Sequence, residues 1–182
     1  AYTGELGWEL HHPIEMQNYL WDRLLLAGPK YGLKLVGARA QNWLRQEKSY
    51  RAFGTELGRD ATPLEADLSR FIDLEKEFLG KEGMENTGVR AKCVTLLIDG
   101  PNGADPWGRE ALYLENGTKV GRLTSGGYSV VFNKSIGMGY IRPDLAQEGQ
   151  RLKVKMLNSL WDAEITCDSP YDPKNETIRK DG

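Results

Sequence analysis

Residues 119–124 read Lys-Val-Gly-Arg-Leu-Thr, and residues 135–140 read Ser-Ile-Gly-Met-Gly-Tyr. Short runs of this kind, bounded by polar or glycine-rich turns, are typical of β-strands. Four similar runs occupy residues 93–98, 111–114, 152–157 and 161–167. Because the runs are short and follow one another closely, they predict a small antiparallel barrel or sandwich after residue 88.

The residues before Gly88 show helical spacing instead. Pro13 is tolerated in a first helical turn, and apolar residues then recur every three or four positions from Ile14 to Ala27. A second helix is expected from Gly37 to Tyr50, with Trp43 on its apolar side as a core residue rather than a cofactor contact. The change of spacing at Gly88 predicts a domain boundary there.

Local motifs predict turns and helix starts between these elements. Thr62-Pro63-Leu64-Glu65 has the spacing of a capping box, so a short helix is expected there, and residues 78–82 predict a further helical turn. Asn116-Gly117 predicts a type I′ hairpin, because both central residues of that turn need positive φ. The polar tail after Pro170 is expected to fray.

The composition argues against several classes of function. Hydrophobic residues make up 40% and charged residues 27% of the 182, as in ordinary globular domains. The net charge is -2 and no basic stripe occurs, so no nucleic-acid partner is expected. Since no run approaches the roughly 20 apolar residues of a membrane span, no membrane partner is expected either.

The cysteines and histidines do not predict a metal site. Cys93 and Cys167 fall in predicted strands without Cys-x-x-Cys spacing, so we expect reduced core thiols rather than a disulfide. His11 and His12 are adjacent, and on an extended chain their side chains would point to opposite sides. We therefore expect both histidines at the surface.

The first nine residues contain the sharpest candidate for chemistry. Tyr2-Thr3-Gly4-Glu5-Leu6-Gly7-Trp8-Glu9 places a carboxylate between two glycines, which let the backbone turn sharply and approach a ligand closely. On spacing alone, the plainer interpretation of Glu5 is an exposed glutamate in a turn.

This segment resembles the Tyr-Thr-Gly-Glu-x-Gly-x-Glu motif of glycine-cleavage T-proteins (aminomethyltransferases). Further segments resemble that family in the same order: residues 37–47, 53–57, 62–66, 78–82, 120–129 and 136–141. The resemblance implies an α+β fold, with residues 1–86 in the family's folate-binding α+β layers and residues 87–182 in its C-terminal β-barrel. It also implies tetrahydrofolate as cofactor, because the family's glutamate holds the pterin, and a carboxylate can accept its neighbouring N–H groups as a pair.

Two features are more similar to dimethylglycine and sarcosine dehydrogenases within that superfamily. They are residues 105–110, Asp-Pro-Trp-Gly-Arg-Glu, and the double glycine before Tyr128. Those enzymes fuse a flavin-dependent region to the folate region, so the resemblance is compatible with FAD in a longer parent chain. No Gly-x-Gly-x-x-Gly follows a predicted strand, so this segment itself is not expected to bind FAD.

The resemblance carries four folate-binding residues onto this chain: Glu5, Tyr50, Tyr2 and Arg39. Counted from Glu47, Tyr50 falls on a folate-site tyrosine, although by spacing alone it is an aromatic at a helix end. The segment before Glu47 is two residues longer than in ordinary T-proteins. Counted back from Glu47, Gln41 rather than Arg39 therefore falls on the position of the family's folate-contacting arginine. The family's catalytic aspartate precedes the motif, so the catalytic residue is unknown and the chain alone is not expected to turn over.

The resemblance implies part of an enzyme that passes a one-carbon unit from an N-methyl or aminomethyl donor to tetrahydrofolate. One alternative is a non-catalytic folate-binding or assembly module, whose Lys-Gly-Cys-Tyr-x-Gly-Gln-Glu motif does not occur here; another is a barrel that is only scaffold. The expected partners are tetrahydrofolate, a methylated-amine or aminomethyl donor and the rest of a parent chain. The expected compartment is the cytoplasm, with the mitochondrial matrix as the alternative.

Overall fold

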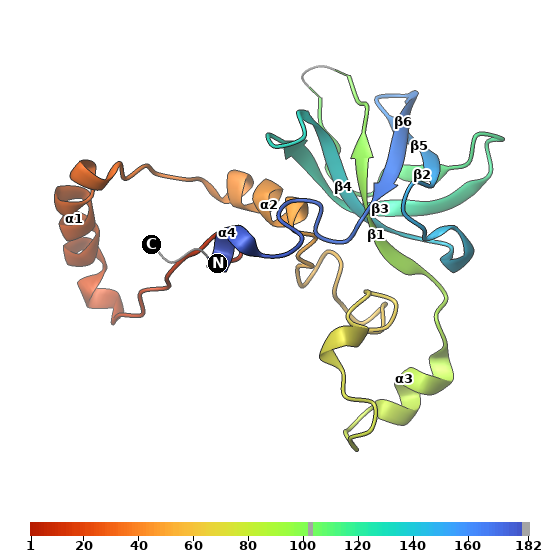
Figure 1. Cartoon of the computed structure of the whole chain (residues 1–182), viewed down its shortest axis with the longest axis horizontal. Coiled ribbons are helices and arrows are strands. Elements are labelled where there is room, and N and C mark those ends of the chain that lie inside the picture. Colours follow the sequence, from red (N-terminus) through yellow and green to blue (C-terminus); the bar gives the residue numbers. More distant parts are fainter. Residues whose placement is uncertain (102–103, 180–182) are drawn as a thin grey trace.

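The computed structural model describes residues 1–101 and 104–179. Its largest part is a closed antiparallel barrel with the strand order β1-β4-β3-β2-β5-β6, which lies to one side of the molecule (Figure 1). The strands are β1 (Lys92–Ile98), β2 (Ala111–Tyr113), β3 (Lys119–Ser129), β4 (Lys134–Ile141), β5 (Arg151–Met156) and β6 (Ser159–Thr166). All six predicted strand runs are therefore confirmed, and of the two predicted architectures the barrel is the one that forms.

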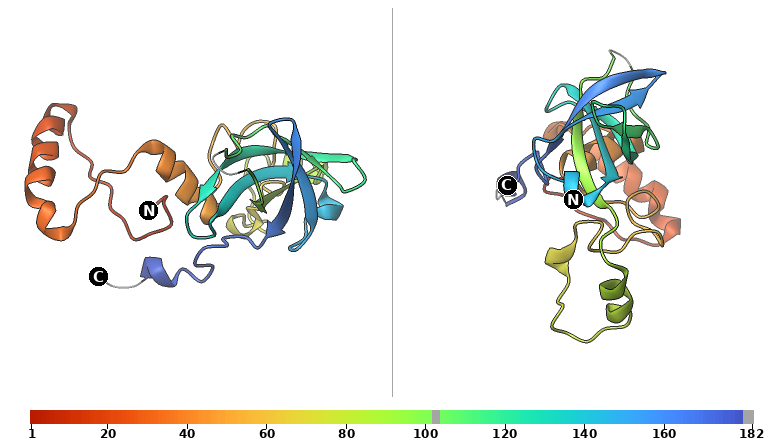
Figure 2. Two further views of the ribbon diagram at one scale, coloured as in Figure 1. Left: turned by 90° about the horizontal axis from the view of Figure 1, so that it is seen from above. Right: turned by 90° about the vertical axis from the view of Figure 1, so that its right-hand side faces the viewer.

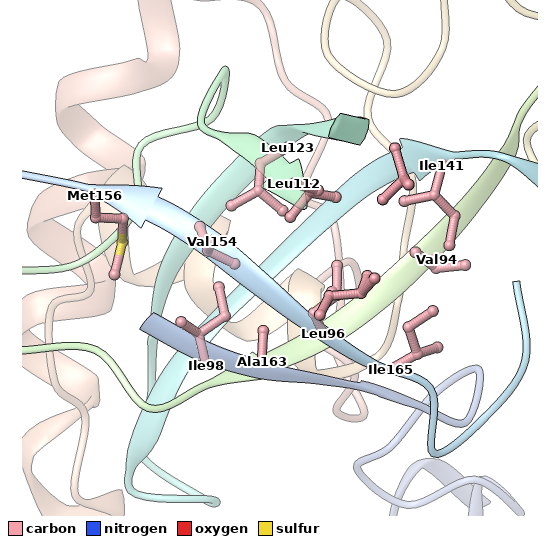
Figure 3. Packing of buried hydrophobic residues seen from close by; sticks show 12 residues of the cluster. Val94, Leu96, Ile98, Leu112, Leu123, Ile141, Val154, Met156, Ala163 and Ile165 are labelled. Atoms are coloured by element: carbon pink, nitrogen blue, oxygen red, sulfur yellow. The ribbon is translucent and has the colours of Figure 1, made fainter. Parts of the chain in front are cut away.

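The interior of the barrel holds the hydrophobic core (Figure 3). Along β5 every second residue is buried, so Leu152, Val154 and Met156 point inward. They meet Leu96 and Ile98 of β1, both of which are fully buried. At roughly 1.5–3 kcal/mol for each buried leucine, isoleucine or methionine, this cluster is the main source of stability.

Helix α2 (Ala38–Glu47) covers the outside of the barrel at β3 and β4. Trp43 of this helix lies on Gly127, where an added Cβ would approach the indole to 2.1 Å. Trp43 also meets Tyr128 edge-on, with ring centroids 6.4 Å apart. Trp43 is thus a half-buried packing residue between helix and barrel, not the core residue that the helical spacing predicts.

Helix α1 (Gln17–Ala27) lies away from the barrel at the end of an extended arm (Figures 1 and 2). The 3-10 turns η1 (Ile14–Met16) and η2 (Pro29–Tyr31) flank it, which confirms the helix predicted from Ile14 to Ala27. None of its residues is buried. Within residues 1–101 and 104–179, no helix is long and apolar enough to cross a bilayer.

The remaining helical segments are short. Their bounds are η3 (Ser69–Phe71), α3 (Lys81–Thr87), η4 (Pro143–Leu145) and α4 (Glu176–Arg179). Helix α3 confirms the helical turn predicted from residue 78 onward, although it begins at Lys81. Leu35 and Val36, between η2 and α2, form no strand and lie in an exposed connecting loop.

The predicted type I′ hairpin at Asn116-Gly117 is wrong in its turn type. Gly117 has a φ of +82°, but Asn116 is not in the positive-φ region. The Gly117 N–H donates to the Leu114 carbonyl and the Leu114 N–H to the Thr118 carbonyl, both at 2.9 Å. This is a type I turn followed by a glycine bulge. The extra loop residue lets asparagine keep an ordinary backbone while glycine alone takes the left-handed position.

The capping box at Thr62 forms, but the helix predicted after it does not. The Thr62 N–H donates to Glu65 Oε2 at 2.8 Å, and the Glu65 N–H donates to Thr62 Oγ1 at 3.2 Å. The chain then makes only a turn, because Asp67 adopts a φ of +59°. Glu65 also accepts from Arg90 Nε at 2.9 Å, so the box joins the start of β1 instead of starting a helix.

The expectation of a frayed tail is wrong for residues 171–179. The Tyr171 N–H donates to the Glu47 carbonyl at 2.9 Å, which fixes the tail on the end of α2. Asp172 then accepts from the N–H groups of Glu176 and Thr177 at 2.7 and 3.0 Å and so caps α4. Residues 180–182, which the same expectation covered, lie outside the described residues.

Candidate functional site

The opening motif folds as a tight loop against the end of α2. Gly4 is buried and has a φ of +83°. An added Cβ there would lie 2.2 Å from Lys48 Cγ, so this position needs glycine for both its backbone and its space. The Gly4 N–H donates to the Ala1 carbonyl at 3.0 Å and closes the loop.

Glu5 follows directly and is half-buried. Its Oε1 accepts a hydrogen bond from the Tyr171 hydroxyl at 2.6 Å. Within the described residues no hydrogen-bond partner of Oε2 is found. The side chain is therefore held in place with one oxygen uncommitted, unlike a freely exposed turn glutamate.

Tyr2 and Tyr50 lie together beside this loop. Their rings stack with centroids 6.0 Å apart and planes inclined by 25°. The Tyr2 hydroxyl donates to the Arg51 carbonyl at 3.1 Å. Three of the four residues named from the sequence, Tyr2, Glu5 and Tyr50, are thus gathered at the C-terminal end of α2.

Arg39 lies elsewhere, in the first turn of α2. Its guanidinium is 5.2 Å from the ring centroid of Trp43 and 5.1 Å from that of Trp107, in two cation–π contacts. At 1.5 Å per residue, the helix separates it from Lys48 by about 13 Å. The structure therefore does not bring Arg39 to Glu5. Gln41, the other position considered for an arginine, is exposed on the same helix.

Lys48 is a site residue that the sequence did not indicate. It is 2% exposed, and its Nζ donates to the Asp172 carbonyl and to Asn175 Oδ1, each at 2.7 Å. The ammonium also lies 6.0 Å from the centroid of the Tyr171 ring. The only available signal was Pro170-Tyr171-Asp172-Pro173, since two prolines around an aromatic restrict the chain in an otherwise polar tail.

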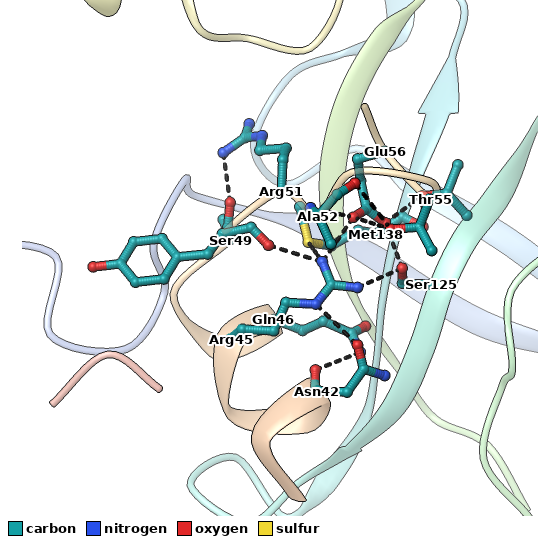
Figure 4. A network of polar contacts seen from close by, with 12 residues as sticks. Asn42, Arg45, Gln46, Ser49, Arg51, Ala52, Thr55, Glu56, Ser125 and Met138 are labelled. Atoms are coloured by element: carbon teal, nitrogen blue, oxygen red, sulfur yellow. Dashed lines mark hydrogen bonds and ion pairs between the residues drawn. The ribbon is translucent and has the colours of Figure 1, made fainter. Parts of the chain in front are cut away.

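A buried ion pair between α2 and the loop that follows it, with its hydrogen bonds to β3, fixes the end of α2 on the barrel (Figure 4). Arg45 Nη1 lies 2.7 Å from Glu56 Oε2, with the two side chains 1% and 0% exposed. Arg45 Nη2 also donates to Ser125 Oγ of β3 at 2.6 Å. Burial raises the pKa of Glu56, but the Arg45 charge and the hydrogen bonds from Ser125, Ala52 and Thr124 outweigh it and leave the pKa lowered.

The two cysteines and two histidines take no part in this site. Both cysteines are free, and burial raises the pKa of the Cys93 thiol to about 12. His11 and His12 are exposed on the arm. In the part of the chain that the structure describes, no three His, Cys, Asp or Glu residues are grouped to hold a metal ion.

The region that carries the Glu5 loop and the closed barrel correspond to the two domains of one protein family. Residues 1–76 match the sequence model of the GCVT N-terminal domain, and residues 92–172 match that of the glycine cleavage T-protein C-terminal barrel domain. The chain belongs to the glycine cleavage T-protein superfamily.

Its relatives include both kinds of protein that the sequence resembles. Mitochondrial dimethylglycine dehydrogenase of Rattus norvegicus is 37% identical over 193 residues, which cover 100% of this chain and 22% of the relative. An aminomethyltransferase of Desulfitobacterium hafniense is 38% identical over 159 residues, covering 85% of this chain and 42% of the relative. Mitochondrial sarcosine dehydrogenase of Mus musculus is 31% identical over 192 residues, covering 98% and 20%.

A solved structure agrees with the fold. The glycine cleavage system aminomethyltransferase T of Bartonella henselae matches with a TM-score of 0.83 at 24% identity, over 95% of this chain and 48% of that one. At this sequence identity the structural similarity supports the fold alone. The chain spans less than half the length of these relatives.

Proposed function

We propose that this chain is the part of a one-carbon transfer enzyme that holds tetrahydrofolate, with residues 1–86 as the folate-binding region and residues 87–182 as the barrel that supports it. The complete enzyme would pass a one-carbon unit from an N-methyl or aminomethyl donor to tetrahydrofolate. Dimethylglycine, sarcosine and glycine-derived donors all suit this chemistry. The single observation that carries the proposal is the half-buried, oriented carboxylate of Glu5.

The donor set of a pterin suits this carboxylate. A pterin edge presents a ring N–H next to an amino group, and a carboxylate has about four lone-pair positions on its two oxygens. Tyr171 uses one of them, so Glu5 can still accept two charge-assisted hydrogen bonds. An ionised glutamate therefore fits the pterin, and the pair of contacts would fix its orientation.

The Tyr2–Tyr50 stack supports the same assignment. The rings lie beside the Glu5 loop, and Tyr2 is 41% exposed, so an aromatic face remains available to a flat ligand. Arg39 is not among the proposed contacts, because its two cation–π contacts place it at the far end of α2. We therefore restrict the proposed pterin contacts to Glu5, Tyr2 and Tyr50.

The proposal is tested by calorimetric titration with tetrahydrofolate under anaerobic conditions. Both the 182-residue chain and the whole polypeptide encoded by its gene should be titrated. Glu5→Gln removes the charge and keeps the shape, and we expect it to raise Kd by about tenfold or more, since hydrogen bonds to a charged group contribute roughly 1.5–3 kcal/mol. Glu9→Gln is the matched control, because the Glu9 side chain is 90% exposed and its carboxylate lies 3.6 Å from His11 Nε2.

Three outcomes would contradict the proposal. In the first, the whole polypeptide binds tetrahydrofolate equally well with Glu5→Gln, which would move the site elsewhere. In the second, neither protein binds tetrahydrofolate, which would leave a scaffold or assembly module of the same superfamily as the better explanation. Equal losses for Glu5→Gln and Glu9→Gln would indicate a general effect of charge rather than a contact.

A further inference from the structure

We propose that Tyr171 is a positioning residue, which orients the Glu5 carboxylate for its ligand from the opposite end of the chain. The inference rests on the proposed function, because orienting the Glu5 carboxylate matters only if that carboxylate binds a ligand. It adds a residue of the tail to a site that is otherwise built from the opening loop and the end of α2.

The contact itself is short and directional. The Tyr171 hydroxyl donates to Glu5 Oε1 at 2.6 Å across 166 positions of sequence. A glutamate side chain in a loop would otherwise lose rotamer freedom only when the ligand binds, at a cost in binding free energy. Holding one oxygen beforehand removes part of that cost.

Tyr171 can act in this way because its own position is fixed. Its N–H donates to the Glu47 carbonyl at 2.9 Å, at the end of α2. The next residue, Asp172, is held through its carbonyl by the buried Lys48 ammonium at 2.7 Å. The same ammonium donates to Asn175 Oδ1 at 2.7 Å, so the tail is anchored at the tyrosine and again at two of the residues that follow it.

The bond also leaves Glu5 able to bind. The phenol is a single donor and engages only Oε1, and within the described residues Oε2 has no partner. The tail would block ligand binding at Glu5 only if it occupied both carboxylate oxygens. The carboxylate in turn raises the pKa of Tyr171, because it favours the protonated phenol that donates to it.

The test is a double-mutant cycle of tetrahydrofolate binding, carried out on the 182-residue chain and on the whole encoded polypeptide. Tyr171→Phe removes the hydroxyl and keeps the ring and the backbone contacts. We expect it to raise Kd roughly five- to tenfold, the size of one hydrogen bond. On a Glu5→Gln background the same change should add no further loss. Tyr31→Phe is the matched control, because Tyr31 is 80% exposed on the arm.

A spectroscopic titration tests the contact without any ligand. With 13C-labelled tyrosine, the pKa of Tyr171 should be higher in the wild-type chain than in Glu5→Gln, a difference that a purely structural role for the ring would not produce. Equal pKa values would overturn the contact. Binding that is unchanged or tighter in Tyr171→Phe would overturn positioning, with tighter binding showing that the tail covers Glu5.

The double-mutant cycle distinguishes a failure of this proposal from a failure of the proposed folate site. If Glu5→Gln weakens binding and Tyr171→Phe does not, positioning fails and the folate site stands. If the wild-type proteins bind no tetrahydrofolate, or Glu5→Gln has no effect, the folate site fails and positioning for that ligand fails with it.

Discussion

Replacing Arg45 by methionine should destabilise the protein far more than breaking a similar ion pair at the surface. Arg45 and Glu56 are 1% and 0% exposed, and their charged atoms are 2.7 Å apart. Removing one partner of such a pair leaves a buried, uncompensated charge, which costs about 3–5 kcal/mol. Methionine fills much of the space of the arginine stem, so the loss reports the charge rather than a cavity.

The lower end of that range is expected, because Glu56 keeps other donors. Its oxygens still accept from the Ala52 N–H at 3.0 Å and from the hydroxyls of Thr55 and Thr124, each at 2.7 Å. We therefore expect about 3 kcal/mol for Arg45→Met, which corresponds to a fall in Tm of roughly 6–12 °C for a chain of this size.

The assay is equilibrium urea unfolding followed by far-UV circular dichroism, with the slope m checked for constancy. The matched control is Arg142→Met. Arg142 and Asp144 are 2.6 Å apart but 54% and 56% exposed, so this variant should lose less than about 1 kcal/mol. A loss for Arg45→Met no larger than that of the control would refute the reasoning.

The pH dependence gives the prediction a second check. Because the folded pKa of Glu56 is lowered, its contribution to stability is present above the unfolded pKa of about 4.3 and is lost as the pH falls through the folded value. The difference between wild type and Arg45→Met should be full at pH 7 and shrink below about pH 4. An identical difference at pH 7 and pH 3 would mean that the lost interaction is not the ion pair.

Three further outcomes are expected elsewhere in the chain. Hydrogen bonds from Arg90 lower the pKa of the buried Glu65 to about 2, so Glu65→Gln should lower the urea midpoint at pH 7, and the difference should fade as the pH falls toward 2. Equal midpoint changes at both pH values would contradict this. Gly127→Ala would place a methyl 2.1 Å from the Trp43 ring, and calorimetry should show that the free energy of unfolding falls by about 1–3 kcal/mol. An unchanged free energy of unfolding would mean that α2 does not pack against Gly127. Helix α1 has only 11 residues and none buried, so its amides should exchange almost without protection while those of β1 and β4 are protected; strong protection of α1 would show that it is covered in solution.

The barrel could be predicted from sequence because its signals are local. Runs such as Leu152-Lys153-Val154-Lys155-Met156 alternate with the period of a strand, and that alternation is what the structure buries. The hairpin at Asn116-Gly117 was found, but its turn type was not, since one additional loop residue changes which backbone angles the same two residues need.

The polar part of the site could not be predicted in the same way. Residues 45–49 read Arg-Gln-Glu-Lys-Ser, and all five are buried. No helical period buries five consecutive polar residues, so a periodic pattern places most of them on a solvated face. They are buried because three segments distant in sequence surround the end of α2: the opening loop, the barrel and the tail. Each of the five side chains makes at least one hydrogen bond to the barrel or the tail, although Gln46 Oε1 has no partner among the described residues. Pairing between distant segments leaves no local signal in the sequence.

This arrangement connects a ligand at Glu5 to the opening loop, the tail and the barrel. Lys48 packs against Gly4 on one side and holds the tail at Asp172 on the other. Three residues earlier on the same helix, Arg45 is paired with Glu56 and with Ser125 of β3. Since these residues share one rigid helix end, displacing the loop, the tail or the barrel strand must disturb the other two. The barrel is therefore part of what holds the carboxylate in place, even though, among the described residues, none of its strands contributes a side chain that hydrogen-bonds to Glu5.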